Sequence, residues 1–346
     1  MDRYGVIEKY NELPLCQRED DYQYRKKCSV NEIFNINSKR NENLIAEDDS
    51  CQKCFKNVNS SNSFCRKCPS KEIFKDIKIL SPLDTLNEII YNNKSISRFG
   101  DGEIKLIYGV GIRFQKPSKE LSVRLKEVLE SQLNGLLVGI NNSLKRDYLN
   151  LFDERGRDFW GRWAENNKVK ISKLLNNDVN YGSSLISRFY LEYQDKSGVS
   201  EFVKVLKKVW DGKDILIVEG KKSRLGVGND LFDNTKSIQR ILCPVTNAFD
   251  IYDKIYDEIL KYGKNKLILL ALGPTATVLA YDLYNDGYQA LDIGHVDIEY
   301  EWYLKKARSK VQIKNKFVNE VNKGKNKVDE NIKDESYNSQ IISEII

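Results

Sequence analysis

Short apolar runs alternate with longer amphipathic segments through the middle of this chain. The runs at 135–140, 214–220 and 266–273 are almost uniformly apolar and end at or beside a glycine. Runs of this kind are typical of strands that are covered on both faces. The segments at 118–133 and 247–263 repeat apolar residues at helical spacing. The alternation predicts an α/β domain with a mostly parallel sheet flanked by helices.

Composition divides the chain into three zones. Residues 1–80 are polar, rich in Asn, Lys and Ser, and hold six of the seven cysteines. Residues 81–322 carry the apolar periodicity of a folded core. Residues 323–346 are charged and poor in aromatic residues, which indicates a tail or a loose helix.

The charge balance favours some partners over others. The net charge is +6 and the pI is about 8.7, which is well short of a dedicated nucleic-acid binder. Such a charge suits an anionic ligand or a peripheral association with an anionic membrane face. No apolar run reaches the roughly 18 residues of a membrane helix, and the N-terminus has no signal-peptide pattern. We therefore expect a cytoplasmic protein whose cysteines are reduced or bound to metal.

The first zone contains two C-x-x-C pairs with ten residues between them. These cysteines are Cys51, Cys54, Cys65 and Cys68. Four thiolates at this spacing predict a structural zinc site. Cys16 and Cys28 either add ligands or are free thiols. Cys243 lies in an apolar context and is expected to be a small core residue.

The clearest supersecondary unit spans 266–292. A strand leads into the turn Gly273-Pro274-Thr275, a helix follows, and a second strand begins after Gly287. A strand-to-helix turn presents free backbone N–H groups at a helix N-terminus, where phosphate binds. The alternative is an ordinary turn with proline at the first helical position.

Two carboxylates stand close together in the segment "SISRFGDGEIKLIYG". Asp101 lies between Gly100 and Gly102, Glu103 follows, and Arg98 precedes them. Asp101 and Glu103 could hold a divalent cation that bridges to a diphosphate, and Arg98 could bind a phosphate. Alternatively, the two carboxylates only cap a helix and complement its dipole.

A basic, glycine-rich loop follows the strand at 214–220. It contains Lys221, Lys222, Arg224 and Asn229. Such a loop predicts an anion cradle. A solvated surface loop is the alternative.

The segment "DIGHVDIEYEW", residues 292–302, alternates ionisable and apolar residues. The ionisable ones are His295, the only histidine, with Asp297, Glu299 and Glu301. An extended segment would place all four on one face. A helix would pair them at i, i+4. Either geometry gathers carboxylates near an imidazole, and a solvated face is the third reading.

Taken together, these segments resemble the GT-D-type glycosyltransferases, a family first described as a domain of unknown function. The matching segments are 97–104, 223–232, 237–249, 270–283, 292–302 and 316–320. The resemblance implies a Rossmann-like domain that transfers a sugar, typically glucose, from a UDP-sugar to a glycan acceptor on a protein or a lipid carrier. It also implies Mn²⁺ or Mg²⁺ held with help from an Asp-x-Glu motif. Residues 1–80 lie outside it.

The resemblance leads to an assignment of roles. Asp101 and Glu103 are the predicted metal ligands, because their glycines allow close approach. Glu299 or Glu301 is the expected general base, with His295 and Asp297 as orienting groups or additional metal ligands. The predicted nucleotide-sugar ligands are Arg98, Gly100, Arg224, Asn229, Gly273, Pro274 and Thr275.

Two other functions fit part of the sequence. A zinc-ribbon protein that binds nucleic acid would use the cysteines and the basic loops, but dense basic patches interleaved with aromatic residues are missing. A metal-dependent phosphohydrolase would use the same carboxylates. The resemblance favours the glycosyltransferase, with no nucleic-acid partner.

Overall fold

The computed structural model describes residues 74–321, 328–329 and 332–346. The zinc prediction therefore falls outside the described residues, as do all six cysteines of the first zone. Cys243 is buried in the core, as expected.

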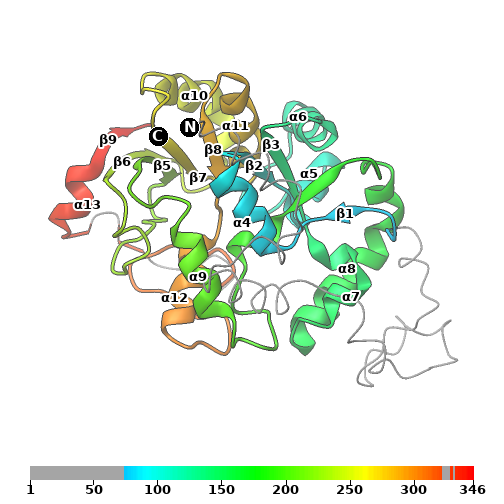
Figure 1. Ribbon diagram of the computed structural model, residues 1–346. Coiled ribbons are helices and arrows are strands. Elements are labelled where there is room, and N and C mark those ends of the chain that lie inside the picture. The colour runs from blue at the N-terminus through cyan, green and yellow to red at the C-terminus, as the bar shows by residue number, and fades with distance from the viewer. Residues whose placement is uncertain (1–73, 322–327, 330–331) are drawn as a thin grey trace, which may run out of the picture.

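Nine strands in the described part of the chain form one sheet in the order β1-β4-β3-β2-β8-β7-β5-β6-β9 (Figure 1). Every neighbouring pair is parallel. The strands are β1 (Lys78–Ile79), β2 (Ser95–Arg98), β3 (Leu136–Ile140), β4 (Asn180–Ser183), β5 (Asp214–Gly220), β6 (Ser237–Cys243), β7 (Leu267–Ala271), β8 (Gln289–Asp292) and β9 (Ile341–Glu344). The three apolar runs are β3, β5 and β7, so the predicted α/β fold is confirmed.

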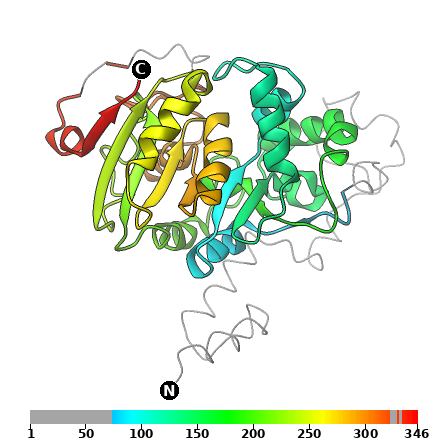
Figure 2. The same ribbon diagram turned by 90° about the horizontal axis from the view of Figure 1, so that it is seen from above.

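Helices lie on both faces of the sheet (Figure 2). The α-helices are α4 (Pro82–Tyr91), α5 (Asp101–Ile107), α6 (Lys119–Glu130), α7 (Arg146–Leu149), α8 (Glu154–Ser172), α9 (Val199–Lys207), α10 (Tyr252–Leu260), α11 (Pro274–Asn285), α12 (Val296–Leu304) and α13 (Glu335–Gln340). Short 3₁₀ turns are η4 (Asn142–Leu144), η5 (Ser184–Ser187) and η6 (Ala248–Ile251). None of the described helices is long and apolar enough to cross a membrane.

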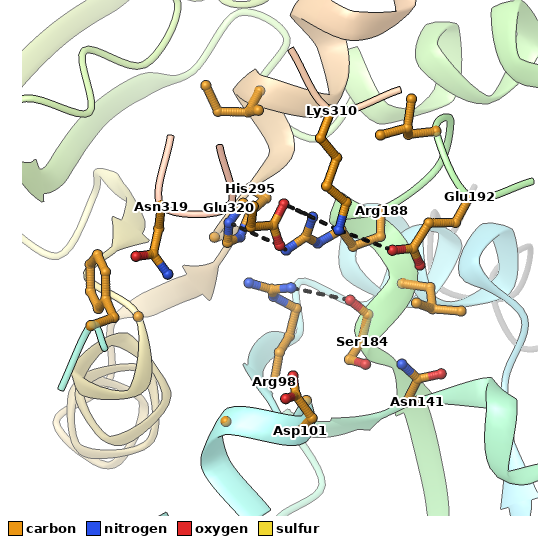
Figure 3. A pocket seen from close by; sticks show the side chains of 18 of the residues that line it. Arg98, Asp101, Asn141, Ser184, Arg188, Glu192, His295, Lys310, Asn319 and Glu320 are labelled. Carbon is orange, nitrogen blue, oxygen red and sulfur yellow. Dashed lines mark hydrogen bonds and ion pairs between the residues drawn. The ribbon is translucent and has the colours of Figure 1, made fainter. Parts of the chain in front are cut away.

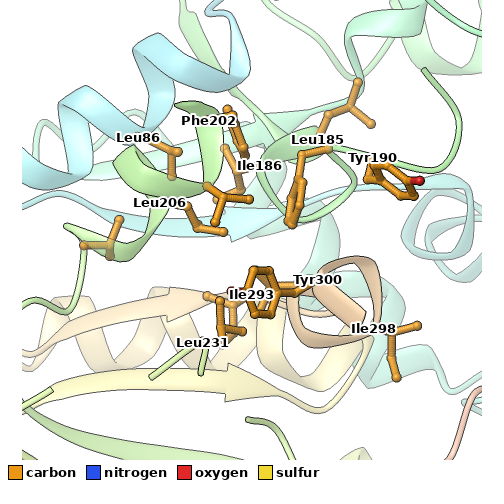
Figure 4. Close-up of a cluster of buried hydrophobic side chains, with 14 of the residues drawn as sticks. Leu86, Leu185, Ile186, Tyr190, Phe202, Leu206, Leu231, Ile293, Ile298 and Tyr300 are labelled. Atoms are coloured by element: carbon orange, nitrogen blue, oxygen red, sulfur yellow. The ribbon is translucent and has the colours of Figure 1, made fainter. Parts of the chain in front are cut away.

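Strand β5 shows how the core is divided. Ile215 and Ile217 join one cluster with residues of α4, α9 and α12, part of which Figure 4 shows. Leu216 and Val218 join a second cluster with residues of α10 and α11 on the other face. Burying each aliphatic side chain stabilises the fold by about 1.5–3 kcal/mol. A strand with two apolar faces therefore lies inside the sheet, here between β7 and β6.

The alternating segment 295–302 is helical. β8 ends at Asp292, and residues Val296 to Trp302 of α12 are all buried. The solvated-face reading is therefore wrong, and the helical alternative holds. A helix that is buried all round needs apolar contacts on several sides and partners for each charge it carries. This requirement explains the mixed pattern.

The C-terminal segment differs from the predicted loose tail. Its last strand, β9, pairs in parallel with β6 at the edge of the sheet. In both views β9 and α8 lie at opposite ends of the molecule (Figures 1 and 2). The sequence "IISE" is short and half-buried, so composition gave little signal for a strand.

Candidate active site

A cavity of about 720 Å³ opens at the carboxyl ends of the strands. Its lining includes Arg98 at the end of β2, Asn141 after β3, Ser184 after β4, Ala271 at the end of β7 and Asp292 at the end of β8. The chain leaves β2 toward β3 and β4, whereas β8 and β7 lie on the other side of β2. The cavity thus occupies the switch point at which open α/β sheets bind ligands, and its volume suits a small molecule.

Arg98 organises the floor of this cavity (Figure 3). Its guanidinium donates to the Asp292 carbonyl (2.6 Å), the Asp292 carboxylate (2.7 Å), the Ser184 carbonyl (3.1 Å) and the Ser187 hydroxyl (2.6 Å). A Cβ at Gly294 would lie 2.0 Å from a guanidinium nitrogen, so only glycine fits there. Burial raises the pKa of Asp292, although Arg98 opposes the shift. Arg98 therefore lines the cavity with its donors largely committed to protein acceptors.

The first Asp-x-Glu motif stands beside Arg98 in the first turn of α5. Glu103 accepts a hydrogen bond from the Gly100 N–H (2.8 Å), and Asp101 pairs with Lys105 (2.7 Å). Burial raises the pKa of Glu103 to about 7, against the Gly100 hydrogen bond, and the charges of Asp292 and Asp101 raise it further. The capping interpretation holds for Glu103. Asp101 and Glu103 also line the cavity, and their binding of a cation stays a prediction.

An ionic network closes the cavity opposite the floor (Figure 3). Arg188 donates to both carboxylate oxygens of Glu320 (3.0 and 2.6 Å). Lys310 lies 3.6 Å from Glu320 and 3.5 Å from Glu192, and His295 Nε2 lies 3.9 Å from Glu320. Burial and the charge of Arg188 lower the pKa of His295 to about 3. The imidazole is therefore neutral at physiological pH and able to accept a hydrogen bond.

Asp297, the first carboxylate of α12, is 1% exposed, and both of its carboxylate oxygens accept hydrogen bonds. Lys316 donates to both of its oxygens (2.9 and 2.7 Å), and the Gly226 N–H and the Asn229 amide donate to Oδ1. Glu301, one turn later, accepts from Asn229 and Lys316 and pairs with Lys305. Asp297 reaches the lining of the cavity and Glu301 does not.

Glu299 points away from this pair. It accepts the backbone N–H groups of Tyr190 (3.1 Å) and Leu191 (3.0 Å), and Arg188 lies 3.8 Å away. Burial raises the pKa of Glu299 to about 7 even though Arg188 lowers it. Glu299 is absent from the lining of the cavity. The structure therefore places both predicted general bases, Glu299 and Glu301, behind the wall of the site, where they hold the wall in place.

The predicted nucleotide-sugar ligands of the basic loop, Arg224 and Asn229, bind other parts of the protein. Arg224 is 1% exposed, has a left-handed φ of 53°, and donates to the carbonyls of Asn315 and Asp329. Asn229 is bonded to α12. Neither side chain lines the cavity, whereas Ser223 and Leu225 do. The buried guanidinium of Arg224 therefore binds the loop to the segments that contain Asn315 and Asp329.

The Gly273-Pro274-Thr275 turn meets the cavity through its first two residues. Gly273 has φ 56°, and a Cβ there would lie 2.5 Å from the ring of Phe114. Pro274 opens the twelve-residue helix α11. Thr275 is fully buried behind them, and its hydroxyl has no hydrogen-bond partner among the described residues. Gly273 and Pro274 thus present a helix N-terminus to the cavity, and Thr275 supports it.

Several site residues were not predicted from the sequence. They are Asn141, Ser184, Arg188, Glu192, Asp292, Lys310, Asn319 and Glu320. Glu320 ends the segment 316–320, which contributed to the resemblance without receiving a role. Arg188 and Glu192 lie in a loop after β4 whose sequence contains no recognisable short motif. Only the folded structure shows that they belong to the site.

Comparison with known proteins identifies the relatives of this chain. A family model for the glycosyltransferase GT-D fold matches residues 96–321. The chain is 38% identical over 278 residues to the probable glycosyl transferase Gly of Streptococcus gordonii, covering 78% of this chain and 39% of that protein. It is 40% identical over 264 residues to glycosyltransferase GlyD of Streptococcus pneumoniae serotype 4, covering 76% and 32%. The chain thus spans about a third of the length of these relatives.

Solved structures extend the match to the fold. One, described as a highly conserved domain of unknown function 1792 with a distinct glycosyltransferase fold, has a TM-score of 0.72 at 41% identity, covering 80% of this chain and 98% of that one. Another, a glycosyltransferase with this domain from Streptococcus sanguinis, has a TM-score of 0.74 at 37% identity, covering 78% and 100%.

These matches define the class of protein: an α/β glycosyltransferase. The chain belongs to the glycosyltransferase family with the GT-D fold, because the family model covers well over half of its residues.

Proposed function

We propose that this chain transfers a sugar, in the first instance glucose, from a UDP-sugar to a glycan acceptor, with help from Mn²⁺ or Mg²⁺. The observation that carries the proposal is the arrangement at the switch point of the sheet. There a helix N-terminus, Arg98 and the Asp101/Glu103 pair face one cavity. A diphosphate leaving group requires compensation of its negative charge, which the helix N-terminus would supply in part and a cation held by Asp101 and Glu103 would supply in the rest.

The donor nucleotide fits the side of the cavity formed by Gly273, Pro274 and Phe114. The N-terminus of α11 favours the diphosphate, and the Phe114 ring offers a surface for a base. Asn319 also lines the cavity, and its side-chain oxygen is buried without a hydrogen-bond partner among the described residues. The uracil N3–H group would satisfy that oxygen.

The Asp101/Glu103 pair fits a divalent cation of the Mg²⁺ or Mn²⁺ type. Burial is the main cause of the raised pKa of Glu103, and the charges of Asp292 and Asp101 add to it. No three His, Cys, Asp or Glu side chains converge as a metal site within the described ranges. A hard cation commonly takes one or two carboxylates and completes its shell with water and substrate phosphates. When bound, such a cation supplies charge compensation for the departing diphosphate.

A screen of UDP-sugars tests the proposal. The chain is incubated with UDP-glucose, UDP-galactose and UDP-N-acetylglucosamine, each with Mn²⁺ or with EDTA, and UDP release is measured. We expect release from one donor that EDTA abolishes. The glycosyltransferase reaction is excluded if no donor is bound or cleaved. Release of inorganic phosphate would identify a phosphohydrolase, and salt-sensitive binding of RNA or DNA without UDP binding would identify the nucleic-acid binder.

A further inference from the structure

The end of the cavity beside α8 differs from the side that suits the donor. Its lining is made of side chains: Asp153, Arg155, Phe159 and Trp160, with Glu192 and Lys310. In Figure 3, Glu192 and Asn319 lie on opposite sides of the Arg98 and Arg188 side chains. Glu192 accepts a hydrogen bond from the Trp160 indole (2.8 Å), which fixes α8 to this end. The cavity therefore has room for a second ligand group beyond the donor.

Phe159 is the unusual residue of this end. It is 48% exposed, whereas the other aromatic residues of this helix are buried, as Trp160 is, or partly buried, as Trp163 is. The ring centroids of Phe159 and Trp160 lie 4.9 Å apart with an interplanar angle of 81°. The centroids of Trp160 and Trp163 lie 5.4 Å apart with an interplanar angle of 86°. The indole of Trp160 is held in turn by Glu192. Phe159 is thus an exposed aromatic surface whose orientation is fixed by its neighbours.

Charged groups of both signs line the same cavity as this ring. Asp153 and Glu192 provide hydrogen-bond acceptors, whereas Arg155 and Lys310 provide donors. Sugar hydroxyls both donate and accept, and one face of a pyranose carries C–H groups that pack on the face of an aromatic ring. A single-signed cluster would favour an ion, but this mixture around an aromatic ring suits a neutral sugar.

We propose that Phe159, supported by Trp160, binds the terminal hexose of the acceptor glycan. This inference rests on the proposed function and names its second substrate site. The ring of Phe159 provides the apolar surface, and the hydroxyls of the sugar reach Arg155, Glu192 and Lys310. The acceptor then lies against the floor of the cavity, facing the donor sugar.

The test separates acceptor binding from donor chemistry. Binding of 4-nitrophenyl hexosides, with glucose, galactose or N-acetylglucosamine as the sugar, is followed by saturation-transfer NMR without any donor. UDP release without acceptor and sugar transfer to the hexosides are measured in parallel. We expect Phe159→Ala to weaken hexoside binding and raise the acceptor KM by about tenfold, with UDP release unchanged. Phe159→Tyr should stay close to the unchanged chain.

Val169→Ala is the matched control, because Val169 is an exposed apolar residue on the same helix and is not part of the cavity lining. It should alter neither reaction. Unchanged hexoside binding in Phe159→Ala, or an equal loss of UDP release and transfer, would overturn the inference. Hexoside binding that depends on Phe159 in a chain that cleaves no UDP-sugar would support the sugar site and reject the proposed donor reaction.

Discussion

The two Asp-x-Glu motifs occupy similar places in the chain but differ in their surroundings. Asp101-Gly102-Glu103 and Asp297-Ile298-Glu299 each lie in the first turn of a helix that follows a strand. The second motif is buried and meets Lys316, Arg188 and backbone N–H groups. The first motif faces the cavity, where Asp101 has one half-exposed lysine partner.

The same short motif therefore serves two purposes in this chain. Charges that the protein itself compensates stabilise its architecture, because an unpaired charge in the interior is costly. Carboxylates left with few protein partners at the edge of a cavity are available to a ligand. In this chain the α12 motif holds the wall of the site, and both carboxylates of the α5 motif line the cavity.

The largest expected effect comes from removing the central cation of the α12 motif. Lys316 is 1% exposed and contacts both Asp297 and Glu301. Lys316→Met should lower the free energy of unfolding by about 3–5 kcal/mol, because it leaves two buried carboxylates undercompensated. Urea unfolding measures the change.

Lys105→Met provides the matched control, since it removes the exposed partner of Asp101. It should cost less than about 1 kcal/mol. Equal losses in the two variants would contradict the contrast between the motifs.

A smaller effect distinguishes the motifs by metal binding. Asp101→Asn should weaken Mn²⁺ binding in the presence of UDP by about 100-fold, whereas Asp297→Asn should change it by less than about threefold. Isothermal titration calorimetry measures both, and circular dichroism verifies folding. Normal affinity in Asp101→Asn together with lost affinity in Asp297→Asn would reverse the roles of the two motifs.

The smallest effect is a dependence of stability on pH. Burial raises the pKa of Glu299 from 4.5 to about 7 in the folded state. Between these values only the unfolded state releases the proton, so stability is lost as the pH rises toward 7 and the loss is complete above it. Relative to Glu299→Gln, the free energy of unfolding of the unchanged chain should fall by on the order of 1–2 kcal/mol between about pH 4.5 and 6. Urea unfolding across this range gives the difference, and a constant difference would show that folding does not shift the pKa of Glu299.

Much of the fold could be predicted because its central strands are buried on both faces. β3, β5 and β7 appear in the sequence as short apolar runs, and α11 begins at Pro274 after a glycine. β9 could not be predicted in this way, because an edge strand needs fewer apolar residues and its pairing with β6 depends on distant chain segments.

Part of the site could also be predicted from the sequence. Arg98, Gly100, Asp101 and Glu103 form one local motif, and the structure places all of them at the cavity. Arg224, Asn229 and Glu301 carried equally suggestive residue types but are turned into the protein, where other segments provide their partners. The direction of a side chain depends on what packs over its element, which local spacing does not contain.

Periodicity, turn residues and short motifs act over a few residues. The α/β class, the βαβ unit at β7–β8 and the glycine-bracketed carboxylates could therefore be predicted without a folded structure. The buried helix that begins at Val296 became visible only in the folded structure, as did the meeting of Arg188, Lys310 and His295 at Glu320. The folded structure also shows that Asp101 and Glu103 both line the cavity, whereas of the second pair only Asp297 does. Those outcomes depend on contacts between segments far apart in the chain, where burial sets the cost of every charge that lacks a partner.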